Sequence, residues 1–133
     1  MFSCSGHFQN GPLLVLPNAV FTEYESFLSD GGRQIHWKHD YFIVKGDLSD
    51  KQKLRNELDT FATKIVNKEI KLYDTYLIFF YKESSEVNEE KIRNVQEGSR
   101  WKIFLWARED DGIVTYSFEK LKLFDAKWNS KYE

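Results

Sequence analysis

The chain has 133 residues and a formal net charge of −2, and 41% of its residues are hydrophobic and 30% charged. This composition is typical of one globular domain and excludes a disordered chain. A charge so close to neutral gives no field that would attract DNA or RNA, so we expect no nucleic-acid partner. The single cysteine excludes an intramolecular disulfide and a multi-cysteine metal site. We expect neither a metal nor a cofactor.

Aromatic residues are unusually abundant, with 11 Phe, 7 Tyr and 4 Trp making up 17% of the chain. Large flat side chains suit a pleated, half-buried surface, so we expect a sheet to dominate the core. The alternative that some of these rings line a concave binding face stays open.

The first twelve residues, MFSCSGHFQNGP, contain Gly6, Gly11 and Pro12 and predict a flexible arm or tether. Residues 13–133 are predicted to form a single α+β domain. Residues 13–16 (LLVL) are apolar but too few to assign by periodicity. Asn18 then favours a helix start, and the pattern predicts a helix that ends at Gly31-Gly32. Its apolar face would consist of Val20, Tyr24, Phe27 and Leu28.

Residues 33–47 alternate and predict a strand. Its more apolar face would carry Ile35, Trp37, His39, Tyr41 and Ile43. Residues 49–70 predict a long amphipathic helix, with Ser49 and Gln52 as a capping box. The apolar stripe of this helix consists of Leu54, Leu58, Phe61, Ala62, Ile65 and Ile70.

Residues 72–82 are apolar on both faces, which predicts a strand in the middle of a sheet. Residues 88–96 favour a short helix held by Ile92 and Val95. Residues 101–109 alternate, and the Asp110-Asp111-Gly112 step predicts a tight hairpin turn into a strand over residues 112–124. In the polar tail, Trp128 and Tyr132 are expected to fold back onto the domain.

The order of these elements predicts an α+β fold of two layers. A mainly antiparallel sheet of about four strands would carry one long amphipathic helix and one or two shorter helices.

The histidines are the first candidates for chemistry. In a strand His36 and His39 point to opposite faces, so they cannot share one metal ion without a bulge. His39 with Asp40, or His36 with an incoming aspartate, would be the possible acid–base pair. No nucleophile-elbow, zinc-protease or phosphate-loop motif is present. Cys4 lies near His7, but a terminal arm is a poor platform for a catalytic thiol.

The start of the chain, Phe2-Ser3-Cys4-Ser5-Gly6, resembles the lipobox of bacterial lipoproteins, in the loose form common among Bacteroidetes. Ser3 matches the small residue before the acylated cysteine, and Ser5 and Gly6 match the flexible tether after it. The resemblance implies lipid attachment at Cys4 and an apolar signal segment before it; the sequence departs from the pattern here, since Met1 and Phe2 stand in place of most of that segment. A lipid at Cys4 would place the domain at a membrane surface, anchored and not spanning.

Three functions remain as hypotheses. The first is a non-catalytic binding module of the cell envelope, periplasmic or surface-facing, with a protein partner; a cytoplasmic location is the alternative. The second is an immunity-type protein that binds and blocks a toxin. The third is a small enzyme or ligand-binding cup that uses His36 or His39. The candidate binding face consists of Trp37, His39, Tyr41, Glu83, Glu86, Glu89 and Glu90.

Overall fold

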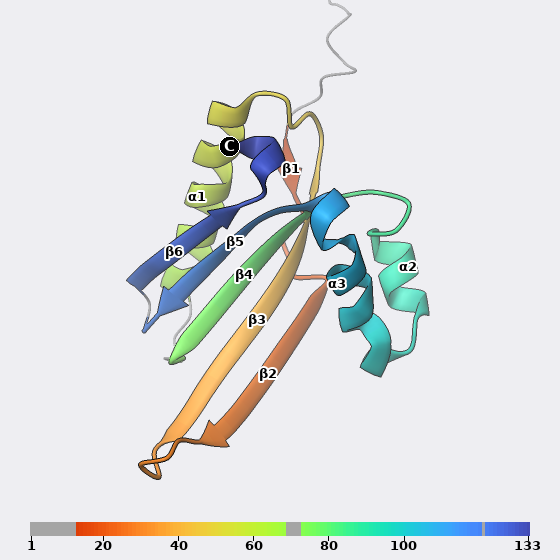
Figure 1. Ribbon diagram of the computed structural model, residues 1–133. Helices are drawn as coiled ribbons and strands as arrows, with labels where there is room; N and C mark the ends of the chain where they lie inside the picture. Colours follow the sequence, from red (N-terminus) through yellow and green to blue (C-terminus); the bar gives the residue numbers. More distant parts are fainter. Residues whose placement is uncertain (1–12, 69–72, 121) are drawn as a thin grey trace, which may run out of the picture.

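The computed structural model describes residues 13–68, 73–120 and 122–133, and in this part of the chain the fold is α+β, as predicted (Figure 1). In chain order the elements are β1 (Leu14–Val15), β2 (Phe21–Leu28), β3 (Gln34–Lys45), α1 (Lys51–Lys68), β4 (Thr75–Lys82), α2 (Glu89–Asn94), the 3₁₀ turn η2 (Glu97–Ser99), α3 (Arg100–Asp111), β5 (Gly112–Glu119), β6 (Lys122–Trp128) and the 3₁₀ turn η3 (Ser130–Tyr132).

The strands form one mixed sheet in the order β1-β3-β4-β5-β6, and β2 pairs with β3 beside β1. The β3–β4 pair is parallel, with α1 as the crossover, and the other pairs are antiparallel. The sheet is therefore larger than the four strands expected from the sequence. Two of the additional strands, β1 and β2, come from the segment before residue 30.

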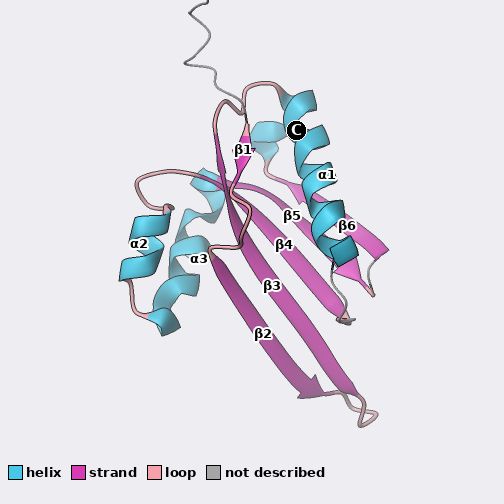
Figure 2. Cartoon of the chain, turned by 180° about the vertical axis from the view of Figure 1, so that it is seen from behind, coloured by secondary structure: helices cyan, strands magenta, loops and turns pink. Residues whose placement is uncertain are grey.

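Helices cover both faces of the sheet, so the expectation of two layers was wrong (Figure 2). Helix α1 packs Leu54, Leu58, Ala62 and Val66 onto one face, which we call the α1 face. Helices α2 and α3 pack on the other, the α3 face, through Ile92, Ile103, Phe104 and Ala107. Because both faces of the central strands are buried, β3 and β4 carry continuous apolar runs where the helices lie.

The predicted helix over residues 18–29 is instead strand β2. The spacing of Val20, Tyr24, Phe27 and Leu28 fits one face of a helix, but the long neighbouring strand β3 offers an edge along its whole first half. All eight residues of β2 pair with it, from Phe21 opposite Tyr41 to Leu28 opposite Gln34. Backbone pairing to β3 therefore overrides a weak local pattern.

The predicted strand over residues 101–109 is instead helix α3. The buried residues of this segment are Ile103, Phe104 and Ala107, at the spacing of a helical face and not of a strand. Gly112 ends the helix rather than making a hairpin turn. A Cβ at this position would lie 2.4 Å from the carbonyl oxygen of Arg108, so the close approach requires glycine.

The hairpin near the C-terminus joins β5 to β6, with Lys120 in the left-handed region at φ 49°. Residues 112–124 were expected to form one strand, but the chain turns back after Glu119. Trp128 and Tyr132 do pack against the core cluster beneath α1, as expected. The Arg55 guanidinium lies 4.5 Å from the centre of the Trp128 ring, which holds this end of the chain on α1.

Strand β3, helix α1, the central strand β4 and the short helix α2 confirm the corresponding sequence predictions. The cap of α1 differs from the expected capping box at Ser49. The Asp50 side chain accepts a hydrogen bond from the Lys53 N–H at 3.1 Å, while the Ser49 N–H donates to Asp47. Asp50 is therefore the N-cap residue. The predictions for the arm 1–12, including Cys4 and His7, and for Ile70 lie outside the described residues.

One carboxylate is buried in the sheet, on the α1 face of β3. Asp40 is 4% exposed and accepts hydrogen bonds from Thr22 in β2, at 2.6 Å, and from the Tyr76 hydroxyl in β4. The Lys38 ammonium lies 3.5 Å away, close to the rings of Tyr24 and Tyr76. Asp40 thus links three neighbouring strands through side chains alone.

We expect Asp40→Ala to lower the free energy of unfolding by about 3 kcal/mol, because it leaves Thr22 and Tyr76 without this acceptor and removes the carboxylate that lies 3.5 Å from the Lys38 ammonium. Urea denaturation measures the change. The matched control is Asp110→Ala, at an exposed aspartate at the end of α3, which we expect to stay within about 0.5 kcal/mol of the original protein. Equal stability of the two variants would contradict the structural role assigned to Asp40.

Candidate functional site

The part of the α3 face that no described helix covers is the candidate site. Helix α3 reaches the row of the sheet that contains Tyr41, where the Phe104 and Tyr41 ring centres are 4.4 Å apart. Below that row the strands continue beyond the helices, and the β2–β3 hairpin projects furthest (Figure 1). The uncovered residues lie in two rows across the strands, which we call the open face.

Strand register defines the two rows. Residues directly opposite in neighbouring strands point to the same side of a sheet. The first row of the open face crosses five strands and consists of Glu23, His39, Leu77, Ser117 and Asp125. The second row lies closer to the hairpin and consists of Glu25, Trp37, Thr75, Glu119 and Lys122.

These two rows carry four carboxylates and one lysine, so with a neutral His39 they have a net charge of −3, and the exposed Lys127 in the neighbouring row of the same face reduces the total to −2. The acidic residues come from both outer parts of the sheet, with Glu23 and Glu25 in β2 and Glu119 and Asp125 in β5 and β6. None of these four residues was among the site residues predicted from sequence. The one local signal was the repeat of glutamate at every second residue in FTEYESFL, which is a strand period and not a helix period.

A groove with a volume of about 510 Å³ runs along the upper side of the open face, between the strands and the end of α3. Its apolar floor includes Leu77 and Phe79. Its polar lining includes His39, Arg108, Ser117, Asp125 and Lys127. A half-apolar hollow with a few charged groups of both signs is typical of a site that binds a ligand or a side chain of a partner.

Stacked rings continue from the groove along β3. The Trp37 and His39 rings stack at 4.0 Å between centres, and His39 meets the edge of Phe79 at 5.5 Å. Phe79 in turn stacks on Tyr41 at 4.5 Å. Trp37, His39 and Tyr41, predicted from sequence to share one face, therefore do so. Tyr41, however, is buried beneath α3, so only Trp37 and His39 of the three belong to the open face.

Glu23 sets the electrostatic environment of this row. Its carboxylate accepts a hydrogen bond from the Tyr41 hydroxyl at 2.9 Å and lies 3.8 Å from Nδ1 of His39. Burial and the bond to Glu23 raise the pKa of Tyr41, so this hydroxyl stays protonated. Burial lowers the pKa of His39 and outweighs the opposing attraction of Glu23, so His39 is neutral at pH 7.

Neither expected histidine–aspartate pair forms through side chains. Asp40 follows His39 directly, but its carboxylate bonds to residues on the α1 face. His36 bonds to the Ser26 hydroxyl at 2.7 Å, and Asp74 bonds only to its backbone, by accepting from the His36 N–H and donating to the His36 carbonyl oxygen. The two histidines lie on opposite faces, as predicted. Among the residues that the structure describes, no group of three His, Cys, Asp or Glu side chains is placed to hold a metal ion.

Glu83, Glu86, Glu89 and Glu90 lie away from the open face, in the loop after β4 and in α2. Three of them have basic neighbours: Lys45 is 3.3 Å from Glu83, Arg93 is 3.8 Å from Glu89, and Lys91 pairs with Glu86. This segment is therefore largely charge-balanced, and the structure does not join it to Trp37 and His39.

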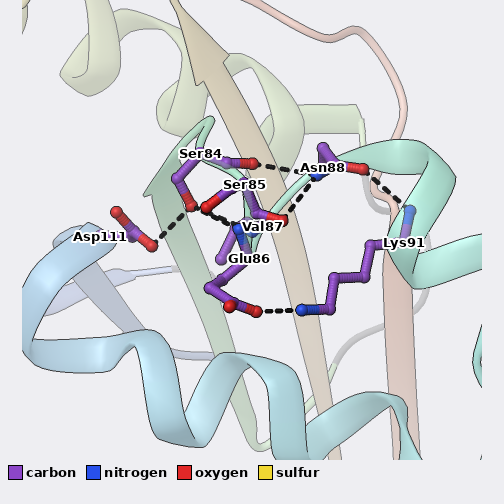
Figure 3. Close-up of polar contacts among 7 residues, drawn as sticks. All are labelled: Ser84, Ser85, Glu86, Val87, Asn88, Lys91 and Asp111. Carbon is purple, nitrogen blue, oxygen red and sulfur yellow. Dashed lines mark hydrogen bonds and ion pairs between the residues drawn. The ribbon is translucent and has the colours of Figure 1, made fainter.

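A network of hydrogen bonds organises the loop before α2 (Figure 3). The Ser84 hydroxyl donates to Asp111 at 2.7 Å and accepts from the Val87 N–H at 3.0 Å. The Asn88 amide donates to the Ser84 carbonyl oxygen at 3.0 Å, and its oxygen caps α2 by accepting from the Lys91 N–H at 2.8 Å. These contacts fix α2 against α3 and explain the polar sequence here without a ligand.

Within the described residues, no helix combines the length and the apolar character needed to cross a membrane. Comparisons of the chain with protein-family models, with curated proteins and with solved structures found no match.

We expect an NMR titration to give His39 a pKa below 6.5, the value of an unburied histidine, because burial disfavours its cation. Glu23→Gln should lower the pKa of His39 further, since it removes a neighbouring negative charge. An unchanged or raised pKa in this variant would contradict the contact.

The same shift predicts how stability depends on pH. The unfolded chain takes up a proton at His39 near pH 6.5, before the folded protein does. The contribution of neutral His39 to stability is therefore complete above about pH 6.5 and is lost as the pH falls toward the folded-state pKa. Thermal unfolding of His39→Gln between pH 7.5 and 5.5 should show a shallower decrease in Tm than the original protein. A decrease of the same steepness would be the contrary result.

Proposed function

We propose that this protein is a non-catalytic binding module whose open face contacts a basic surface of a protein partner. The observation that carries the proposal is the excess of carboxylates in the two rows around Trp37 and His39, with a net charge of −3. Acidic and basic surfaces attract one another at long range, which speeds association and selects the partner.

The remaining chemistry of the open face supports a protein partner. Trp37 is half-buried and rigidly stacked on His39, so it presents a flat apolar surface at little cost in side-chain entropy. Leu77 and Ser117 lie between the acidic ends of the first row and leave its centre less polar than its ends. An apolar centre within a charged rim is the usual arrangement of a protein interface.

The second part of the proposal concerns location. The lipobox-like start supports attachment of a lipid at Cys4, with residues 5–12 as the tether of an envelope module.

An immunity-type protein is the second candidate function, and the same acidic face favours it. A protein that blocks a basic toxin needs a complementary acidic surface with aromatic anchors. Both proposals use the open face as the binding surface. They differ in the effect of binding, because a toxin partner would lose its activity when bound.

A ligand-binding cup is the third candidate, and the groove beside His39 favours it. The groove is large enough for a small amphipathic molecule, with Arg108 and Lys127 available to an anionic group. We propose no catalytic step, because none of the described contacts joins His39 to a nucleophilic side chain in the groove.

The proposal predicts that Ser117→Arg weakens partner binding at least ten-fold, because a long cation fills the middle of the first row and opposes a basic partner. A partner captured from envelope extracts should be identified, produced separately and titrated by calorimetry. Its affinity for the original protein should also fall as salt rises, since the attraction is between surface charges.

Thr63→Arg is the matched control. Thr63 is exposed on α1, so an arginine at this position adds the same charge on the opposite side of the sheet. It should bind the partner as the original protein does. Equal loss in both variants would show a general charge effect, and no loss in Ser117→Arg would place the interface elsewhere; either result contradicts the proposal.

Lipid attachment is tested separately in the source cells, with the gene expressed together with its own upstream sequence. An alkyne-tagged fatty acid should label the protein, and Cys4→Ala should abolish the label and release the protein from the membrane fraction. A protein that is never labelled contradicts the tether but leaves the open face untouched.

A further inference from the structure

We propose that the free edge of β2, residues 23–28, binds an extended strand of a partner that carries lysine or arginine at every second position. This inference goes beyond the proposed function, because it concerns backbone pairing at the edge of the sheet, although Glu23 and Glu25 belong to both surfaces. Figures 1 and 2 show β2 as the outermost strand, with its lower half beyond the helices. Among the described residues, β2 pairs only with β3.

Backbone geometry indicates which groups the edge offers. The Ser29 N–H donates to the Arg33 carbonyl oxygen at 2.8 Å, and antiparallel strands alternate between bonded and non-bonded pairs. The backbone groups of Glu23, Glu25 and Phe27 therefore point toward β3. Those of Tyr24, Ser26 and Leu28 point outward, where an added strand would meet them.

Apart from its two glutamates, the edge lacks the features that usually protect an outer strand. Residues 21–28 contain no proline or lysine, and their register with β3 is unbroken. The strand also exposes large apolar side chains: Tyr24 is 65% exposed, Phe27 45% and Leu28 68%. A strand that combines free backbone groups with apolar side chains on both sides is suited to pairing with another strand.

The charges of β2 select the chemistry of the occupant. Glu23 and Glu25 point to the α3 face, two residues apart, and Glu25 forms no ion pair with the described residues. A partner strand with basic residues at alternate positions would place its cations opposite these carboxylates, while its other side chains would meet Tyr24 and Leu28 on the α1 face.

The same charges disfavour a second copy of this chain. In a continuous antiparallel sheet, the two registers that pair most of β2 with itself are centred on Tyr24 and on Glu25. The first places Glu23 opposite Glu25, and the second places Glu25 opposite its own copy. Like charges directly opposite one another destabilise a strand pair, so these two registers are disfavoured and a basic strand suits this edge better than a second β2.

The test uses the peptide fluorescein-Lys-Val-Lys-Thr-Lys-Val-amide, labelled at its N-terminus, and measures its affinity by fluorescence anisotropy. Ser26→Pro removes one outward N–H and no backbone bond to β3, so the sheet tolerates it at an edge. We expect at least a ten-fold loss of affinity. Ser26→Ala is the matched control, since it also loses the hydroxyl bonded to His36 but keeps the N–H; it should bind within about three-fold of the original protein.

A second measurement keeps the test independent of the fold of the proline variant. When the peptide is added to the original protein, hydrogen exchange at the amides of Tyr24 and Ser26 should slow, because these groups become bonded. The peptide acetyl-Glu-Val-Glu-Thr-Glu-Val-amide should not bind, and Glu25→Gln should weaken binding of the lysine peptide.

Three results would overturn the proposal. The lysine peptide does not bind saturably; or it binds Ser26→Pro as tightly as the original protein, which means that charge alone attracts it; or the original protein sediments as a dimer that Ser26→Pro dissociates, which makes a second copy the occupant. None of these results bears on Ser117→Arg and the partner of the open face, so the two proposals fail separately.

Discussion

The mismatch in length between the central strands and the helices that cover them determines the rest of the structure. Strand β3 has 12 residues and extends about 40 Å, whereas α3, also of 12 residues, is about 18 Å long. The helices therefore seal only one end of the sheet, where Tyr41 to Val44 are buried on both faces. The other end must be stable without a second layer on the α3 face, and it is there that polar and aromatic side chains are exposed together.

Polar side-chain bonds hold the projecting hairpin where apolar packing is thin. The Thr22 hydroxyl bonds to Asp40 on one face of the sheet, and Glu23 accepts from Tyr41 on the other. Closer to the turn Ser26 meets His36. Each bond crosses from β2 to β3, so the edge strand is attached through side chains as well as backbone. This attachment lets β2 keep a free outer edge and still remain ordered, which both proposed binding surfaces require.

Sequence periodicity was reliable where one pattern was long and strong, and failed where two patterns overlapped. Strand β3 and helix α1 were predicted because their apolar residues repeat at one period over many residues. In α3, the alternation of Trp101 with Ile103 suggested a strand, although the residues that become buried are Ile103, Phe104 and Ala107. The candidate site followed the same division: Trp37 and His39 were placed on one face by the alternation of β3, but the acidic residues opposite them in β2 were assigned to a helix.

The sequence by itself determined the α+β class, the central strands, the long helix and the separation of His36 from His39, because each depends on the local period of the chain. The tertiary structure decided the identity of β2 and α3, the coverage of both faces and the acidic character of the open face. These features depend on register between strands far apart in the chain, which brings Glu23, His39 and Asp125 into one row. No local pattern encodes that alignment, since it depends on which strand edge each segment pairs with during folding.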